Sequence, residues 1–272
     1  MTTPRTYLFV PGNRPERFAK ALSSGADAVV LDLEDAVAAE AKSAARDAIA
    51  AWAATANTAE RQRSVVRIND AAAPGFADDL HLLRQVGLAD VMLPKAECAG
   101  HVAAVLAALP GARVLALIES ARGIAHVDAV AASAGVQRLV FGTLDFALDL
   151  ELDISERSDG LSYAASRLAI ASRSAGLAAP VAGVTPQIND EARLLADWAW
   201  SRRHGLGAKL CIHPRQVAPI HAALAPTAQA LDWARRVLAA EATSPGAAQL
   251  DGRMIDRPVL LQAQRLLLRA PR

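Results

Sequence analysis

The chain has 272 residues, of which 53% are hydrophobic, and it carries 29 lysines and arginines against 28 aspartates and glutamates. A charge this close to balance predicts no nucleic-acid partner and no anionic membrane surface, so any anion site must be local. No stretch approaches the ~18 uninterrupted apolar residues of a membrane span, and the N-terminal apolar run is too short for a signal peptide. Cys98 and Cys211 lack ligand spacing and are typical of reduced thiols. We therefore expect a cytoplasmic protein.

Short apolar runs with strand character recur along the chain, once every ~20–30 residues. Most of them end in a charged or polar residue, as 27–35 does in DAVVLDLED. An apolar run of this length is typical of a buried parallel strand. The eight predicted strands cover 6–10, 27–35, 64–69, 90–95, 113–120, 138–142, 179–184 and 207–214.

Helical stretches alternate with these strands. Asn13 is expected to cap the first helix and Gly25 to end it. A longer excursion, residues 143–160, follows the sixth strand. The other predicted helices lie at about 40–54, 75–86, 99–109, 161–175 and 189–203.

This alternation predicts an α/β fold, a (β/α)8 TIM barrel. An open doubly wound sheet is the alternative, but it calls for a glycine-rich first turn, and PGNRPER at 11–17 does not match GxGxxG. Beyond residue 225 the pattern changes to two helical segments, 228–241 and 256–269, joined by a glycine-bearing loop. We expect residues 1–225 to form the barrel and 226–272 to add a C-terminal helical extension and lid loop to the same domain.

Charged and polar residues follow the predicted strands where each strand ends. In a TIM barrel these ends meet at one rim, and the active site lies there. So many carboxylates at one rim require cations nearby, because unpaired buried charge is costly. The residues concerned are Asp32, Glu34, Asp35, Arg67, Lys95, Glu119, Asp145 and His213.

Two of these acids are candidate metal ligands. Glu119 and Asp145 offer the oxygen donors that Mg2+ prefers, and Mg2+ is commonly held by one or two carboxylates. Glu34 and Asp35 are expected to surround the ion as hydrogen-bond acceptors for its water. The alternative is that some of these acids form structural ion pairs with a basic residue of the rim.

Each basic residue of the rim also has two possible roles. The planar guanidinium of Arg67 fits a substrate carboxylate, or instead an internal pair with Asp32 or Glu34. For Lys95, a rim ion pair is favoured over a Schiff base. For His213, a structural role is favoured over catalysis.

The first loop is a different kind of candidate site. Arg14 and Lys20 lie around a predicted helix N-terminus, which favours anions through its free N–H groups. Together with Phe9 they are suited to a nucleotide-like phosphate and its base. The alternative is that both basic side chains are simply solvated.

The sequence resembles a known family, the citrate lyase beta-subunit-like proteins of the HpcH/HpaI aldolase superfamily. The similar stretches run in family order from residue 8 to about 267. The LDLEDAV block and the pair formed by IES and FGxxD are specific in combination. The matching stretches are LFVPGNRPERFAKA, GADAVVLDLEDAV, VVRIN, VMLPKAE, ALIESARGI, LVFGTLDFALDL, KLCIHPRQV and DGRMIDRPVLLQAQRLL.

The resemblance implies a Mg2+-dependent carbon–carbon lyase, with Mn2+ as the other candidate ion. Such an enzyme cleaves a 3-hydroxyacyl-CoA, similar to malyl-, citramalyl- or citryl-CoA, into an acyl-CoA and a 2-oxo acid. The resemblance also implies a TIM barrel assembled as a homotrimer or hexamer.

The resemblance assigns roles to individual residues. It places Glu119 and Asp145 on the metal and Arg67 on the substrate. It places the CoA portion on Phe9, Arg14 and Lys20. It makes Asp256, from a neighbouring subunit, the acid/base at the enolate carbon, whereas position alone predicts that Asp256 caps a helix.

Two departures from the family pattern concern the loop after the sixth strand. Thr143-Leu144 stands where members often have Ala-Glu, and Asp149-Leu150-Glu151 stands where they commonly have DLG. The identity of the acyl group is therefore left open. The rival interpretations are a metal-dependent aldolase acting on free 2-oxo acids and a subunit that works only with an acyl-carrier-protein complex.

Overall fold

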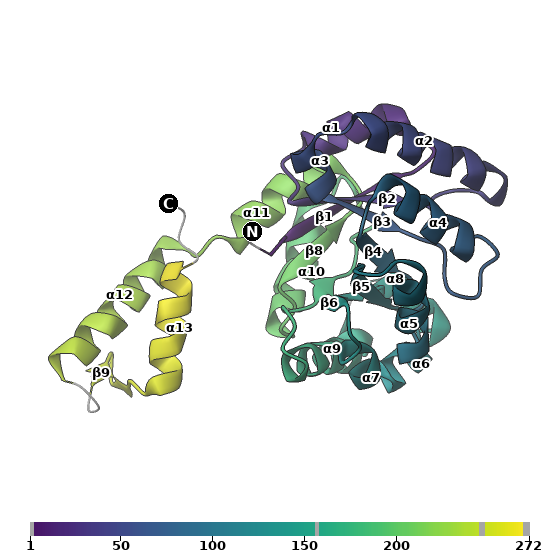
Figure 1. Cartoon of the computed structure of the whole chain (residues 1–272). Helices are drawn as coiled ribbons and strands as arrows, with labels where there is room; N and C mark the ends of the chain where they lie inside the picture. Colours follow the sequence, from purple (N-terminus) through teal and green to yellow (C-terminus); the bar gives the residue numbers. More distant parts are fainter. Residues whose placement is uncertain (1–2, 156–157, 245–247, 269–272) are drawn as a thin grey trace. The chain divides into compact units, whose positions relative to one another are not determined.

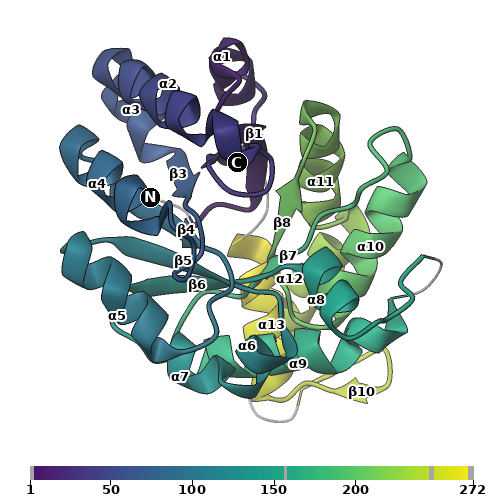
Figure 2. The ribbon, with the colours of Figure 1, turned by 90° about the vertical axis from the view of Figure 1, so that its right-hand side faces the viewer.

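The computed structural model describes residues 3–155, 158–244 and 248–268. Eight parallel strands close into a barrel in the order β1 to β8, with β8 pairing back to β1 (Figure 1). Helices surround these strands (Figure 2), so the predicted (β/α)8 barrel is confirmed. The strands are β1 Thr6–Pro11, β2 Ala28–Asp32, β3 Ser64–Arg67, β4 Asp90–Leu93, β5 Arg113–Ile118, β6 Val136–Phe141, β7 Val181–Ala182 and β8 Ala208–Cys211.

The helices between the strands fall close to the predicted stretches. Several short ones were not predicted, among them the pair between β5 and β6. The α-helices are α1 Phe18–Leu22, α2 Lys42–Thr55, α3 Thr58–Gln62, α4 Phe76–Val86, α5 Ala99–Ala108, α6 Ala121–Ala125, α7 Val127–Ala131, α8 Thr143–Asp149, α9 Ser162–Ser174, α10 Glu191–Arg203 and α11 Val217–Leu224. Short 3-10 helices are η1 Pro15–Arg17, η2 Ala39–Ala41, η3 Asp159–Leu161 and η4 Pro214–Gln216.

Alternate residues of the strands build the inside of the barrel. On β8, Ala208 and Leu210 join this inner cluster, so the side chains between them face the helices. No pore is left, because branched and aromatic side chains fill the interior. The inner cluster consists of Tyr7, Ala28, Val30, Val65, Met92, Leu115, Leu117, Val140, Val181, Ala208 and Leu210, with Phe9 and Val184 packed against it.

The chain divides into two compact units, Met1–Ile220 and His221–Arg272. In the second unit, α12 Ala228–Thr243 packs against α13 Arg257–Leu268, and between them runs a hairpin of β9 Gln249–Leu250 and β10 Arg253–Met254. Its turn residues, Asp251 and Gly252, have φ values of 51° and 72°. A two-residue hairpin turn needs this left-handed backbone, and Asp-Gly supplies it at low cost.

One local prediction was wrong. Asn13 does not cap a helix: the first helical turn begins at Pro15 with Arg14 as its N-cap, and no side chain bonds to it. The excursion after β6 contains a short helix, α8, which begins directly after Gly142. Among the described residues, no helix has the length and apolarity needed to cross a membrane.

Candidate active site

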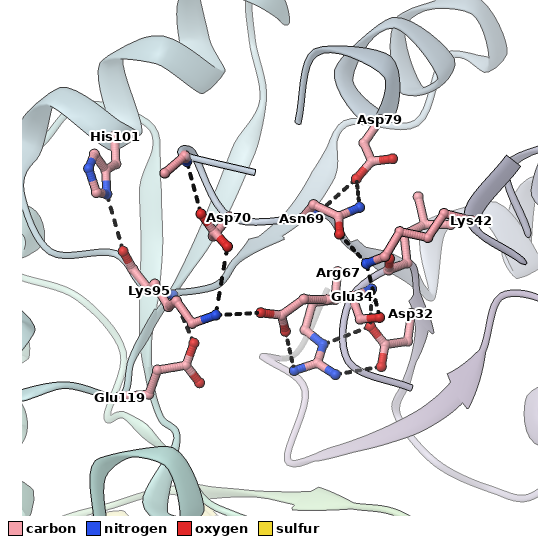
Figure 3. Close-up of polar contacts among 12 residues, drawn as sticks. Asp32, Glu34, Lys42, Arg67, Asn69, Asp70, Asp79, Lys95, His101 and Glu119 are labelled. Atoms are coloured by element: carbon pink, nitrogen blue, oxygen red, sulfur yellow. Dashed lines mark hydrogen bonds and ion pairs between the residues drawn. The ribbon is translucent and has the colours of Figure 1, made fainter. Parts of the chain in front are cut away.

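The pairing of β2 with β3 sets Asp32 beside Arg67 at the ends of the two strands. Arg67 donates from Nε to Asp32 Oδ1 at 2.7 Å and from Nη2 to Asp32 Oδ2 at 2.5 Å. Its Nη1 lies 2.6 Å from Glu34 Oε2 (Figure 3). The internal pair that the sequence left open is therefore present. Two of the five guanidinium N–H groups are thus hydrogen-bonded to Asp32, and Nη1 faces Glu34 in an ion pair, which leaves N–H groups for another acceptor.

Glu34 is buried, yet its oxygens are poorly satisfied. Its contacts with Arg67 and, at 3.6 Å, with Lys95 Nζ are ion pairs. Neither contact has hydrogen-bond geometry, and both carboxylate oxygens are buried without a hydrogen-bond donor among the described residues. Buried acceptors of this kind need a further partner. A bound cation and its water would supply one.

The side chain of Glu119 is hydrogen-bonded to the backbone of Lys95, which has an unusual conformation. Glu119 follows β5 and is buried, with 4% of its surface exposed. Its Oε1 accepts a hydrogen bond of 2.8 Å from the backbone N–H of Lys95. Lys95 has φ 45°, a left-handed conformation that is strained for a residue with a side chain. The strain directs an N–H group at the carboxylate, and the Lys95 side chain forms the predicted rim ion pair, with Asp70 at 3.7 Å as well.

Asp145 reaches the same rim from the neighbouring strand. Ile118 of β5 pairs with Phe141 of β6, so Glu119 lies beside Gly142, and Asp145 falls in the first turn of α8. A Cβ atom on Gly142 would lie 2.5 Å from the Oε2 atom of Glu119. Only glycine leaves room there for the carboxylate. This requirement explains the glycine of the FGxxD motif.

The carboxylates of the rim repel one another. Burial raises the pKa of Glu119 to about 8, with the charges of Glu34 and Asp145 adding to the effect. Burial likewise raises the pKa of Glu34 to about 7, against the lowering influence of Arg67. A cation held among these groups would remove this penalty.

The residues fit a hard divalent cation with an incomplete protein ligand set. Among the described residues, no three His, Cys, Asp or Glu side chains form a metal-binding group. Glu119 and Asp145 are the carboxylates that could hold such an ion, and the charge of Glu34 lies close to Glu119. Mg2+ suits this arrangement, because it is commonly bound by one or two carboxylates and keeps positions for water and substrate.

A polar network under the rim was not predicted. Lys42, at the start of α2, donates to the carbonyl oxygens of Leu33 at 3.0 Å and Glu34 at 3.3 Å, and also to Asn69 Oδ1 (Figure 3). Asn69 is fixed in turn by the fully buried Asp79, which accepts from its backbone N and its Nδ2 at 2.7 and 2.6 Å. The network ties the loop that carries Glu34 to the loop after β3. The sequence of this alanine-rich helix did not predict that Lys42, its first residue, would join the two loops.

The remaining candidates lie apart from this cluster or at its edge. Phe9 is in the barrel mouth, where the Arg67 guanidinium lies 4.9 Å from its ring centroid. Arg14 and Lys20 are exposed, and Arg14 pairs with Glu16 at 2.7 Å. Asp35 is exposed.

Two further candidates have local structural roles. His213 accepts through Nδ1 from the backbone N–H of Arg215 at 3.2 Å and so caps η4. In the second unit, Asp256 is exposed, and its Oδ1 accepts from the backbone N–H of Val259 at 3.1 Å. This contact caps α13. It neither supports nor excludes an acid/base role.

Residues 5–214 match the model of the HpcH/HpaI aldolase/citrate lyase family. The chain belongs to this family and is a carbon–carbon lyase.

Individual relatives cover nearly the whole chain. A citrate lyase subunit beta-like protein of Mycobacterium tuberculosis is 37% identical over 97% of this chain and 94% of its own. An L-malyl-CoA/beta-methylmalyl-CoA lyase of Cereibacter sphaeroides is 33% identical over 98% of this chain and 94% of its own. A crystal structure of CitE from Mycobacterium tuberculosis, in complex with magnesium, acetoacetate and coenzyme A, superimposes with a TM-score of 0.88 at 36% identity, covering 99% of this chain and 98% of that one.

Proposed function

We propose that this protein is a Mg2+-dependent lyase that cleaves a 3-hydroxyacyl-CoA into an acyl-CoA and a 2-oxo acid. The observation that carries the proposal is the group of buried carboxylates, Glu34 and Glu119, that faces Arg67 at the mouth of the barrel. The similar CitE structure with magnesium and coenzyme A, and the malyl-CoA lyase relative, support the metal and the thioester.

Each residue of the rim has a defined task in this proposal. Glu119 and Asp145 hold Mg2+ or Mn2+, and Glu34 and Asp35 add negative charge around the ion. When bound, the ion acts as a Lewis acid that stabilises negative charge developing on substrate oxygens. Arg67 binds the substrate carboxylate through the N–H groups that Asp32 and Glu34 leave unused.

The remaining tasks concern the thioester and the protons. Phe9, Arg14 and Lys20 bind the CoA portion. The bond between the α- and β-carbons breaks, the hydroxyl group loses its proton as the 2-oxo acid forms, and the α-carbon of the acyl-CoA gains one. Asp256 of a neighbouring copy, in a homotrimer or hexamer, delivers the proton to that carbon.

A substrate panel tests the proposal. The purified chain is assayed with Mg2+ on malyl-, methylmalyl-, citramalyl- and citryl-CoA, and on the corresponding acids without CoA. We expect release of a 2-oxo acid from at least one thioester and from none of the free acids. Turnover of the free acids alone would favour a metal-dependent aldolase. Turnover that appears only with added partner subunits would favour an acyl-carrier-protein complex.

A further inference from the structure

A cavity lies outside the barrel strands, on the side of β7 and β8 that faces α10. Its volume is about 160 Å³, and its wall includes Gly183, Lys209, Trp200 and the first residues of α8. A cavity of roughly 150 Å³ is large enough for a ligand of six heavy atoms such as benzene. None of the rim residues Glu34, Arg67, Glu119 and Asp145 lines it.

Lys209 gives this cavity a positive charge. Its neighbours on β8 point into the barrel, so Lys209 points outward, and 2% of its surface is exposed. Its Nζ donates to the carbonyl oxygen of Gly183. Within the described ranges it forms no ion pair. An ammonium group has three N–H donors, so this single bond leaves capacity for a ligand.

Asp197, the acid near Lys209, does not neutralise its charge, because Asp197 already accepts hydrogen bonds from other groups. Asp197 accepts from Arg193 Nε at 2.8 Å and from Thr185 Oγ1 at 2.7 Å. The other two nitrogens of Arg193 donate to backbone carbonyl oxygens, Nη2 to Ile154 at 3.1 Å and Nη1 to Ser155. Among the described residues that line the cavity, two cations, Arg193 and Lys209, stand against one acid, Asp197. Burial accordingly lowers the pKa of Lys209 to about 8.

Trp200 also lines the cavity. Its indole Nε1 is buried and has no hydrogen-bond partner among the described residues. Buried N–H groups without a partner are rare and costly, which points to an occupant that accepts a hydrogen bond. Much of the remaining wall is apolar, with Leu144, Ile154, Leu161, Val184 and Pro186.

We propose that this cavity binds a short-chain monocarboxylate of about four carbons, whose carboxylate contacts the Lys209 ammonium group and the Trp200 indole N–H and whose alkyl end meets the apolar wall. A carboxylate offers the acceptors that both donors lack, and the charge it brings balances the buried cation. Four carbons and two oxygens make six heavy atoms, which suits the volume. The proposal does not rest on the proposed reaction, because binding at this site requires no turnover.

The occupied cavity would also stabilise the first turn of α8. Thr143 and Leu144 line it, and Asp145 follows them directly. The carboxylate is therefore a candidate effector of the metal site.

The test is a titration with butyrate of the full chain labelled with 15N in its four tryptophans, in the presence of EDTA so that no metal contributes. We expect a saturable shift of one indole resonance, identified as Trp200 by its loss in Trp200→Phe, with a dissociation constant of about 1 mM. The neutral isostere butyramide should shift it by less than a tenth as much. The exposed Arg173→Met variant should bind like the parent chain.

Lys209→Met supplies the decisive comparison, because methionine keeps most of the volume and removes the charge. We expect the saturable shift to disappear in this variant. An unchanged titration in Lys209→Met, an equal response to butyramide, or no shift of the Trp200 resonance in the parent chain would overturn the proposal. If Lys209→Met does not fold, the butyrate and butyramide titrations of the parent chain decide alone. Absence of a shift would mean that water occupies the cavity.

Discussion

Gly142 controls the position of the Glu119 carboxylate. A methyl group at this position would lie 2.5 Å from both Cβ and Oε2 of Glu119, closer than real contacts allow. We predict that Gly142→Ala weakens Mg2+ binding by roughly 10–100-fold while the barrel remains folded, because the carboxylate must move away from its place at the rim. Calorimetric titration with Mg2+, together with circular dichroism, checks this prediction.

The matched control is Gly100→Ala in α5, where the added Cβ would meet its nearest neighbour at 3.5 Å, an ordinary contact. Its Mg2+ affinity should equal that of the parent chain. If Gly142→Ala also binds Mg2+ normally, Glu119 does not hold the ion.

Lys209 gives a pH-dependent prediction at the same scale. Burial lowers its pKa from 10.5 to about 8, with Asp197, Arg193 and Cys211 as the charged or titratable groups around it. Between these pH values the unfolded chain retains a proton that the folded chain has lost. The free energy of unfolding therefore rises with pH over this window.

We expect the parent chain to gain about 3 kcal/mol relative to Lys209→Met between pH 8 and 10.5, since one pKa unit corresponds to ~1.4 kcal/mol. Below pH 8 the difference between the two chains should be constant. Urea unfolding across this pH range measures it, and the other titrating groups cancel because both chains contain them. Parallel curves for the two chains would show that Lys209 titrates normally.

Some site residues are readable from the sequence and others are not. Glu119 directly follows β5, and Asp145 lies in the first helical turn after β6, so their arrival at one rim follows from the fold. Pattern alone left open the partner of Arg67, which the structure shows to be Asp32 and Glu34. The left-handed backbone of Lys95 and the space required at Gly142 depend on contacts between neighbouring strands, and no local pattern reveals such contacts.

At the scale of elements, the loops after β2 and β3 are joined by the bonds of Lys42 and Asn69. The Lys42 ammonium group donates to the backbone carbonyl oxygens of both Leu33 and Glu34. We predict that Lys42→Met lowers kcat/KM about tenfold or more, because small displacements of site groups are costly. Hydrogen exchange at the amides of Leu33 and Glu34 should speed up in parallel, which a loss of charge alone would not cause.

The exposed Glu40→Gln variant, two residues away, serves as the control and should match the parent chain in both measurements. Slower turnover with unchanged exchange at residues 33 and 34 would mean that Lys42 does not position the loop.

The eight strands and the longer helices were predictable because their apolar periodicity is strong. Finer details depend on tertiary contacts. In the helix at residues 143–149, Phe146 packs edge-on against Phe141, with ring centroids 5.4 Å apart. The Asn13 prediction was wrong because the first helical turn begins one residue later than expected, so that Arg14 occupies the N-cap position.

At the scale of the whole molecule, the second unit contains Asp256, whose role is either that of an acid/base or that of a helix cap alone. Its carboxylate caps α13, and asparagine caps helices as well as aspartate does. We predict that Asp256→Asn keeps the cap, the fold and the oligomer but loses about a hundredfold in turnover, because it cannot transfer a proton. Asp256→Ala should lose the same activity and ~1 kcal/mol of stability in addition. Full activity in Asp256→Asn would reduce this residue to a structural cap.

A site shared between copies makes a further prediction about assembly. Arg67→Ala and Asp256→Ala are each expected to be inactive, since each lacks one part of the site. Reassembled mixtures of the two chains should regain part of the parent activity, because some sites would combine an intact Arg67 with an intact Asp256. Mixed oligomers that contain both chains and remain inactive would exclude sharing.

The central claim is cleavage of a carbon–carbon bond in a CoA thioester, and product stoichiometry tests it most directly. The chain is incubated with Mg2+ and the most active thioester of the panel, and acyl-CoA, 2-oxo acid and free CoA are quantified in the same quenched samples. We predict equal amounts of acyl-CoA and 2-oxo acid, no free CoA, and no products when EDTA removes the metal. Free CoA released together with an intact hydroxy acid would show thioester hydrolysis instead and would contradict the claim.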